Sequence, residues 1–153
     1  MVLSKDFREF IELLNERRVK YLVIGGYAVT FHGYPRYTKD IDFWIWLDDE
    51  NLSHLEKVLS DFGLGSIGLT KEHFKNPDDV IQLGYEPNRI DILVALEGLN
   101  FEESFGNKSI KEIDGIDVNF IGIDDLIKAK KIAGRLKDLA DVETLEKIKN
   151  NKS

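Results

Sequence analysis

Residues 40–47 restrict the fold more than any other segment, because an apolar run begins there with two aspartates. Side chains alternate along a strand, so Asp40 and Asp42 would share one face, roughly 7 Å apart along the backbone, with Ile41 and Phe43 on the other. Two carboxylates on one face of an apolar strand repel each other and lose hydration. A divalent cation between them would relieve both costs, and Mg²⁺ prefers oxygen ligands. The alternative is a solvent-facing edge strand on which the aspartates only maintain solubility.

A third aspartate interrupts a second predicted strand. Asp91 lies within the apolar residues 89–96, and an unpaired charge is seldom buried. If the two strands are neighbours, Asp91 completes a cluster of three carboxylates, which is a ligand set for two-metal phosphoryl transfer. The alternative is that Asp91 forms a salt bridge with Arg89 or with another cation.

The remaining pattern alternates helices and strands. An apolar stripe behind the predicted N-cap Ser4 indicates a helix over residues 4–18, and residues 21–24 read as a buried strand. Further expected elements are a short helix over 27–32, a helix to about residue 62, a strand near 80–83, a hairpin around Asp114-Gly115 and helical residues 124–149, in one or two pieces. Glycines 63, 65 and 68 break the pattern between them. We expect one α+β domain over residues 1–153.

Composition narrows the functional classes. The chain has no cysteine, which excludes disulfides and thiolate chemistry. Its net charge of -7 argues against a broad electrostatic grip on long nucleic acid, although a local basic patch stays open. The first residues lack the apolar core of a signal peptide, and no apolar run is long enough for a bilayer span. We therefore expect a cytoplasmic protein without membrane contact.

The predicted strand over residues 21–24 ends at Gly25-Gly26. Adjacent glycines let a backbone approach a ligand closely, and their amides can hold phosphate oxygens at a helix start. The pair matches neither the dinucleotide fingerprint nor a P-loop. A plain tight turn is the alternative.

The order of these features resembles the signature of the nucleotidyltransferase superfamily that includes DNA polymerase beta. Thirteen residues separate Gly25-Gly26 from Asp40-Ile41-Asp42, and Asp91 follows in a later strand. The string Arg36-Tyr37-Thr38-Lys39 before the aspartates, together with residues 135–141, is similar to a small prokaryotic branch related to toxins of type IV toxin–antitoxin (abortive infection) systems. The resemblance covers nearly the whole chain.

This resemblance implies a nucleotidyltransferase fold, a small mixed sheet with helices packed mainly on one face. It implies that Gly25 and Gly26 contact the triphosphate of an NTP such as ATP. Asp40 and Asp42 would hold two Mg²⁺ ions, or Mn²⁺ in their place, and Asp91 would bind the catalytic metal and help to deprotonate the attacking hydroxyl. Many members carry serine at the position of Gly26, so Thr38 or backbone amides would have to replace that hydroxyl contact. Arg36 and Thr38 are further candidates for nucleotide binding.

A helical wheel drawn over residues 124–141 places Lys128, Lys131, Arg135 and Asp138 on one face. We expect Lys131 and Arg135 to reach the nucleotide phosphates, with Asp138 orienting one of them. The wheel puts Lys130 and Lys137 elsewhere. The alternative is a solvated face with ordinary ion pairs. Tyr34 and Tyr37, in the loop before the aspartates, either stack on a base or pack that loop.

Taken together, these features predict a metal-dependent enzyme that moves a nucleoside monophosphate from an NTP to an acceptor hydroxyl and releases pyrophosphate. A tRNA or other RNA end, a protein or a small molecule such as an antibiotic remains open as the acceptor. One alternative is a non-catalytic nucleotide-binding or antitoxin-like module, and an antitoxin is an expected kind of partner. A two-metal nuclease fits less well, because the chain contains no Glu-x-Lys motif.

Overall fold

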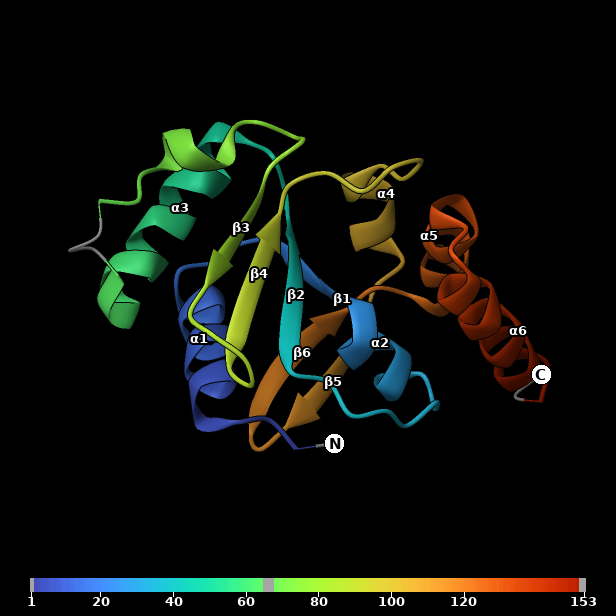
Figure 1. The fold of residues 1–153 in the computed structure, drawn as a ribbon. Helices are drawn as coiled ribbons and strands as arrows, with labels where there is room; N and C mark the ends of the chain where they lie inside the picture. Colours follow the sequence, from blue (N-terminus) through green and yellow to red (C-terminus); the bar gives the residue numbers. More distant parts are fainter. Residues whose placement is uncertain (1, 65–67, 152–153) are drawn as a thin grey trace.

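The computed structural model describes residues 2–64 and 68–151 (Figure 1). Its centre is a mixed sheet of six strands in the order β3-β4-β2-β1-β6-β5. The strands are β1 Tyr21–Ile24, β2 Asp40–Ile45, β3 Val80–Leu83, β4 Arg89–Leu93, β5 Ser109–Ile113 and β6 Ile116–Phe120. Strand β2 pairs with β1 in antiparallel and with β4 in parallel orientation. The predicted α+β class with a mixed sheet is confirmed.

Helices connect and flank these strands. They are α1 Lys5–Glu16, α2 Gly25–Phe31, α3 Asp49–Leu59, α4 Phe101–Gly106, α5 Ile123–Ala133 and α6 Leu136–Asn151, with a π-helical turn η1 Ser60–Leu64 and a 3-10 turn η3 Lys71–Phe74. Strands β2 and β4 end a few residues before the predicted bounds, and α2 begins directly at the glycine pair rather than at residue 27. In the described part of the chain, no helix has both the length and the apolar character needed to cross a membrane.

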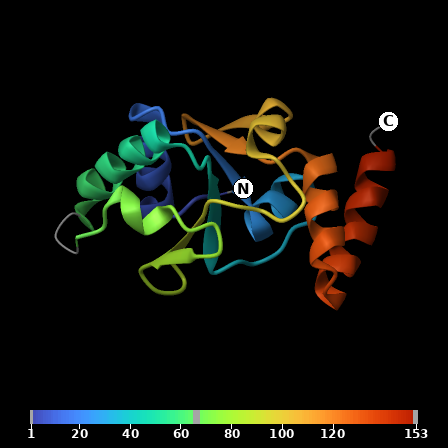
Figure 2. The same ribbon diagram turned by 90° about the horizontal axis from the view of Figure 1, so that it is seen from above.

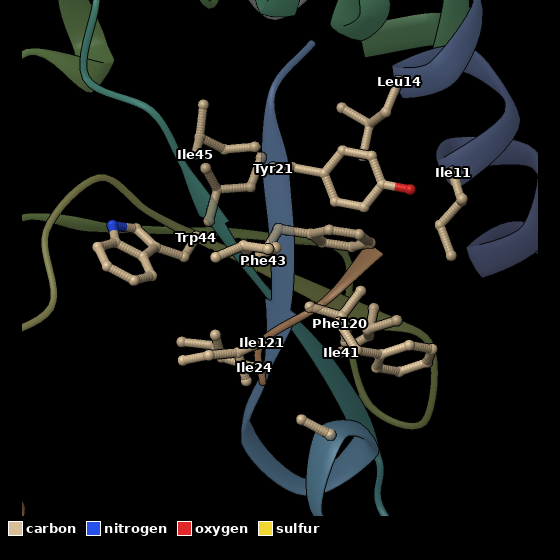
Figure 3. Close-up of a cluster of buried hydrophobic side chains, with 14 of the residues drawn as sticks. Ile11, Leu14, Tyr21, Ile24, Ile41, Phe43, Trp44, Ile45, Phe120 and Ile121 are labelled. Atoms are coloured by element: carbon tan, nitrogen blue, oxygen red, sulfur yellow. The ribbon is translucent and has the colours of Figure 1, made fainter. Parts of the chain in front are cut away.

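One face of the sheet is covered by α1 and α3, as the view along the sheet shows (Figure 2). The Ser4 side chain accepts a hydrogen bond from the Phe7 amide and caps α1, as predicted. The apolar stripe of α1 is fully buried, and Phe10 meets Phe43 of β2 with ring centroids 5.3 Å apart. Figure 3 shows Tyr21 and Phe43 on the side of the strands that faces α1. Alternation along β2 therefore gives Ile41, Phe43 and Ile45 to this core.

The opposite face of β2 carries its even-numbered residues. Trp44 packs edge-on against Phe101 of α4, with ring centroids 5.2 Å apart, and closes that face at the far end of the strand. Asp40 and Asp42, at the beginning of β2, lie on the same face but are only partly buried. On this face of β2, aromatic packing therefore covers the end at Trp44, and the two aspartates lie at the other end.

The predicted hairpin is confirmed, since β5 and β6 pair in antiparallel orientation across Asp114 and Gly115. Both turn residues have positive φ, 51° and 84°, as a two-residue hairpin turn of the favoured twist requires.

The C-terminal helical region divides into two helices at Gly134, which adopts a left-handed conformation with φ 66° and ends α5. Helix α6 then returns beside α5, and Figures 1 and 2 show the two helices packed side by side. The single continuous helix assumed by the wheel over residues 124–141 is therefore wrong. A glycine at C′ is a common stop signal, and here it reverses the chain.

Candidate active site

The strand register brings the three aspartates together. In the parallel pairing of β2 with β4, Asp42 lies opposite Asp91 and Asp40 lies opposite Arg89. These four residues form the corners of what we call the carboxylate square, on the face of the sheet that α1 does not cover. Ligand oxygens of Asp40, Asp42 and Asp91 all lie within 4.8 Å of one another. The expectation that Asp91 approaches the other two closely enough to share metal ions is met.

Among the three aspartates, Asp42 has a strongly raised pKa. Burial, together with the charges of Asp40 and Asp91, raises the pKa of Asp42 to about 7, although Arg89 opposes the shift. Burial also raises the pKa of Asp91, whose exposed fraction is 6%, although the guanidinium of Arg89 acts in the opposite direction. One arginine does not balance three clustered carboxylates, so the square attracts a further cation.

Arg89 contacts two of the three aspartates. Its Nε donates to Asp91 Oδ1 at 2.8 Å, and its Nη2 donates to Asp91 Oδ2 at 3.0 Å and to Asp40 Oδ2 at 2.9 Å. The sequence left two interpretations of Asp91 open, and both apply. Asp91 is a member of the carboxylate cluster and also an ion-pair partner of Arg89.

The β1–α2 turn closes over the square. Gly25 has φ 69°, and a Cβ atom built there would lie 2.2 Å from Asp42 Oδ2. Only glycine combines this left-handed conformation with so close an approach to the carboxylate. At Gly26 the conflict is milder, since an added Cβ would lie 3.3 Å from the Thr38 side chain, which would have to shift slightly. The Thr38 hydroxyl donates to the Asp40 carbonyl at 2.8 Å and so holds the start of β2.

A cleft of about 410 Å³ opens beside the square. Its lining includes Gly25, Gly26, Arg36, Thr38, Asp40, Asp42 and Arg135, all of them site residues predicted from the sequence. The lining also contains Glu86, Lys130 and Lys137, which sequence reasoning did not assign to the site. The lining thus combines the carboxylates of Asp40 and Asp42 with cationic side chains from three separate segments.

Two buried aspartates of α6 organise those cations. Asp138 and Asp141 have exposed fractions of 1% and 2%. Arg135 Nε lies 2.6 Å from Asp138 Oδ2, Lys130 Nζ lies 2.9 Å from Asp141 Oδ2, and Arg36 donates to Asp141 Oδ1. We call these five residues the hairpin network. It joins the α5–α6 hairpin to the loop that precedes β2.

The pKa values in the hairpin network shift opposite to those in the square. The hydrogen bond from Arg135 holds the pKa of Asp138 below its ordinary value. Burial would raise the pKa of Asp141, but hydrogen bonds from Arg36 and Lys130 outweigh it and the pKa is lowered. Both carboxylates are therefore stabilised as anions by the cationic side chains that they pair with.

Lys131 lies outside the cleft, contrary to the helical wheel. Its side chain is 56% exposed, and its Nζ pairs with Glu146 Oε1 at 2.9 Å. Lys130, which the wheel placed elsewhere, takes the position at the cleft. The reversal at Gly134 separates Lys131 from Arg135, and a glycine between two helical patterns was the signal that the continuous wheel overlooked.

The cleft beside the aspartates is not the more voluminous of two hollows on the protein. A shallower hollow of about 610 Å³ lies between the end of α1 and the β5–β6 hairpin, lined by residues such as Glu12, Lys20 and Phe105. Within residues 2–64 and 68–151, the acidic side chains close enough to share a metal ion are the three aspartates of the carboxylate square. They do not line this hollow.

A mixed sheet with clustered strand carboxylates beside a glycine turn is the arrangement expected of a nucleotidyltransferase, and comparison with known proteins agrees. Residues 3–151 match the family described as "Nucleotidyltransferase of unknown function" (DUF6036), and the chain belongs to this family. A search of curated protein sequences gave no significant match.

Solved structures of nucleotidyltransferases share the fold. A nucleotidyltransferase from Thermotoga maritima (TM1012) superposes with a TM-score of 0.58 at 18% identity, covering 95% of this chain and 91% of that one. The lincosamide antibiotic adenylyltransferase LnuA, solved with lincomycin bound, gives 0.55 at 17% identity over 96% and 98%. ANT(2'')-Ia, solved in complex with adenylyl-2''-tobramycin, gives 0.52 at 17% over 94% and 90%. At these identities the similarity concerns the fold.

The residues of the square suit a divalent metal. Their donors are hard carboxylate oxygens, which Mg²⁺ and Mn²⁺ both accept. The raised pKa of Asp42 indicates that the anionic form lacks sufficient compensation within the protein. A bound divalent cation would supply it, as two-metal sites do for clustered carboxylates.

Proposed function

We propose that this protein is a metal-dependent nucleotidyltransferase that moves a nucleoside monophosphate from an NTP to an acceptor hydroxyl. The observation that carries this proposal is the convergence of Asp40, Asp42 and Asp91, with ligand oxygens within 4.8 Å of one another, beside a cleft that is also lined by cationic side chains. Phosphoryl-type transfer needs positioning and charge neutralisation more than covalent chemistry from the protein, and clustered carboxylates beside cations suit both needs.

In this proposal the three aspartates would hold two Mg²⁺ ions, or Mn²⁺, and the ions would supply charge neutralisation for the phosphates. The acceptor oxygen forms a bond to the α-phosphorus, the bond from that phosphorus to the β-phosphate oxygen breaks, and pyrophosphate leaves. Asp91 accepts the proton of the acceptor hydroxyl and releases it to solvent.

The nucleotide occupies the cleft with its triphosphate between the glycine turn and the cations. Gly25 and Gly26 line the cleft beside Asp42, and in this proposal their backbone amides hold phosphate oxygens at the start of α2. Lys130 and Arg135 offer charge-assisted hydrogen bonds from the hairpin, and Arg36 offers one from the loop before β2. Lys130 takes the role that the sequence assigned to Lys131.

The acceptor is proposed only as a hydroxyl compound. LnuA and ANT(2'')-Ia were solved with lincomycin and with adenylyl-tobramycin, so antibiotic hydroxyls belong among the acceptors to be tested. RNA ends, including tRNA, and protein side chains remain in the same set. The relation to type IV toxins and the need for an antitoxin are parts of the proposal, as is a cytoplasmic location.

Metal-dependent labelling tests the proposal. The protein is incubated with each of the four α-³²P-labelled NTPs, with Mg²⁺, Mn²⁺ or EDTA, and with cell-extract RNA, cell-extract protein, lincomycin or tobramycin as the acceptor. We expect label to move to one acceptor class with equimolar pyrophosphate release, only when metal is present. The matched control is Asp42→Asn, which keeps the size of the side chain and removes one ligand charge.

The same assay separates the alternatives. Nucleotide that binds without transfer to any acceptor would support the non-catalytic module. Metal-dependent cleavage of the RNA, or of a DNA substrate added in parallel, would support the nuclease. Growth arrest on expression that Asp42→Asn abolishes would support a toxin, whereas arrest by both proteins would contradict a toxic transfer activity.

A further inference from the structure

The carboxylate square already contains a cation that belongs to the protein. Arg89 stands at its fourth corner, two residues before Asp91 on β4 and opposite Asp40 on β2. Its guanidinium donates to both of these aspartates, and Nη2 alone bridges Asp40 Oδ2 and Asp91 Oδ2. Both carboxylate oxygens of Asp91 accept from Arg89, so an ion bound by Asp91 would have to share or replace these hydrogen bonds.

We propose that Arg89 is an internal competitor of the metal, which fills the carboxylate square when no metal is bound and withdraws toward Glu86 when metal binds. This inference rests on the metal site of the proposed function and assigns to Arg89 a role in setting the affinity of that site. Arg89 is a positioning residue in this scheme, since it acts through Asp40 and Asp91 rather than on the substrate.

Competition follows from charge and from shared atoms. Three carboxylates at this spacing repel one another, and the guanidinium reduces that repulsion without metal. When a divalent ion arrives, its charge repels the guanidinium, and either oxygen of Asp91 that it takes as a ligand is one that accepts from Nε or Nη2. The net affinity for metal is therefore lowered by the free energy needed to break these charge-assisted hydrogen bonds.

Glu86 gives the displaced guanidinium an alternative partner. It belongs to the loop between β3 and β4 and lines the cleft, and its Oε1 lies 3.6 Å from Arg89 Nη1. The Glu86 side chain is 49% exposed and the Arg89 side chain 24% exposed, so both have room to move together toward solvent. Rotation of the long arginine side chain would exchange Asp40 for Glu86 while the backbone of β4 stays in place.

Arg89 also has a simpler interpretation, which predicts the opposite result. If its only task is to hold Asp91 in the ligand orientation, removing it would disorganise the site and weaken metal binding. If it competes, removing it would strengthen metal binding. The sign of the change in affinity separates the two, and a merely structural arginine would change stability without this gain.

The test is Mn²⁺ binding followed by electron paramagnetic resonance, on the full chain without nucleotide. We expect Arg89→Gln to lower the Mn²⁺ dissociation constant by roughly fivefold or more, a typical coupling between two linked sites. Arg89→Lys, which keeps the charge, should stay within about twofold of the unsubstituted protein, and Glu86→Gln should weaken binding about twofold to fivefold because the withdrawn arginine loses its partner. Arg17→Gln, which breaks a surface pair with Asp61, is the matched control and should change nothing.

Thermal unfolding gives a second measurement if binding titrations are limited by folding. Arg89→Gln should lower the unfolding temperature in EDTA and show a larger rise on addition of Mn²⁺ than the unsubstituted protein. Weaker Mn²⁺ binding or unchanged binding in Arg89→Gln would overturn the inference while leaving the metal site intact. Absence of Mn²⁺ binding by the unsubstituted protein would overturn both the inference and the proposed metal dependence.

Discussion

The carboxylate square and the hairpin network both bury aspartates at the edge of one cleft, but they differ in what surrounds the charge. In the square, Asp42 and Asp91 have raised pKa values, with burial as the main cause and one arginine nearby. In the network, Asp138 and Asp141 are more deeply buried and yet have lowered pKa values, because cations from three segments reach them. Burial alone therefore does not distinguish carboxylates that lack sufficient cationic partners from carboxylates that are paired within the chain.

The difference between the two regions lies in charge balance. The network matches two carboxylates with Arg36, Lys130 and Arg135, so its charges are satisfied within the chain. The square has three carboxylates and one arginine, so its negative charges outnumber its cations when all three carboxylates are ionised. We expect the square to govern activity and the network to govern stability, and substitutions in each can test that division.

The largest expected effect is on catalysis in the square. Asp42→Asn removes a ligand charge, and we expect the rate of nucleotidyl transfer to fall by about a thousandfold or more, on the order of 4 kcal/mol of lost transition-state stabilisation. The measurement is the initial rate of pyrophosphate release with the NTP and acceptor identified by labelling. Circular dichroism should show an intact fold. A variant that keeps a tenth of the rate would remove Asp42 from the metal site.

The next effect is on stability in the hairpin network. Asp141→Asn leaves Arg36 without its carboxylate partner and leaves the mostly buried Lys130 only its longer contact with Asp138, at 3.6 Å. Breaking a buried ion pair in this way costs about 3 kcal/mol. Urea unfolding with EDTA present measures it. The matched control is Asp61→Asn, which breaks the exposed pair with Arg17 and should stay within about 0.5 kcal/mol. Equal losses in both variants would mean that the network adds nothing beyond a surface pair.

Much of the fold could be read from the chain because its signals are local. Ser4, the buried stripe of α1 and the glycine pair each reported on neighbours in sequence, and the elements they predicted are present. Alternation along β2 gave the common face of Asp40 and Asp42. The proximity of Asp91 needed one further assumption, that the two strands are neighbours, and the parallel register of β2 and β4 satisfies it.

The cationic side of the cleft was predicted less well, since it depends on a chain reversal. Lys130 and Lys131 are adjacent, and a wheel error of one residue exchanges an inward for an outward side chain. Gly134 ends α5, so residues before and after it do not share a helical phase. Glu86 belongs to an irregular loop with no periodicity, and only the tertiary structure brings it to Arg89.

A smaller effect is expected on nucleotide affinity, and the adjacent residues Lys130 and Lys131 provide the comparison. Lys130→Met removes a cation that lines the cleft and should weaken the binding of a non-hydrolysable NTP analogue roughly tenfold to a hundredfold, equivalent to about 1.5–3 kcal/mol. Lys131→Met removes an exposed cation paired with Glu146 and should leave the affinity within about twofold. Isothermal titration calorimetry at a temperature where both variants are folded makes the comparison. A greater loss at Lys131 would restore the continuous-wheel interpretation.

The smallest expected effect is a difference in pH dependence between the two regions without metal. The folded pKa of Asp42, about 7, lies above the ordinary aspartate value of 3.8. The native state therefore holds a proton through this interval that the unfolded state has lost, and the stability contribution of Asp42 falls as pH rises from about 4 to 7. The pKa values of Asp138 and Asp141 are lowered, so their contribution is complete above the ordinary value and is lost only as pH falls below it.

These signs predict different outcomes for two matched variants in EDTA, a fall for one comparison and no change for the other. Between pH 5.5 and pH 8, the unfolding free energy of the unsubstituted protein should fall relative to Asp42→Asn by on the order of 1–2 kcal/mol, because aspartate ionises there and asparagine does not. Relative to Asp138→Asn it should not change, since Asp138 is ionised in both the folded and unfolded states across this interval. Urea titrations of the three proteins at the two pH values measure both differences. Saturating Mg²⁺ should abolish the fall at Asp42, because a bound cation favours the ionised carboxylate. A fall that persists with Mg²⁺ would show that the ion does not reach Asp42, and a flat difference in EDTA would show that Arg89 alone already balances the square.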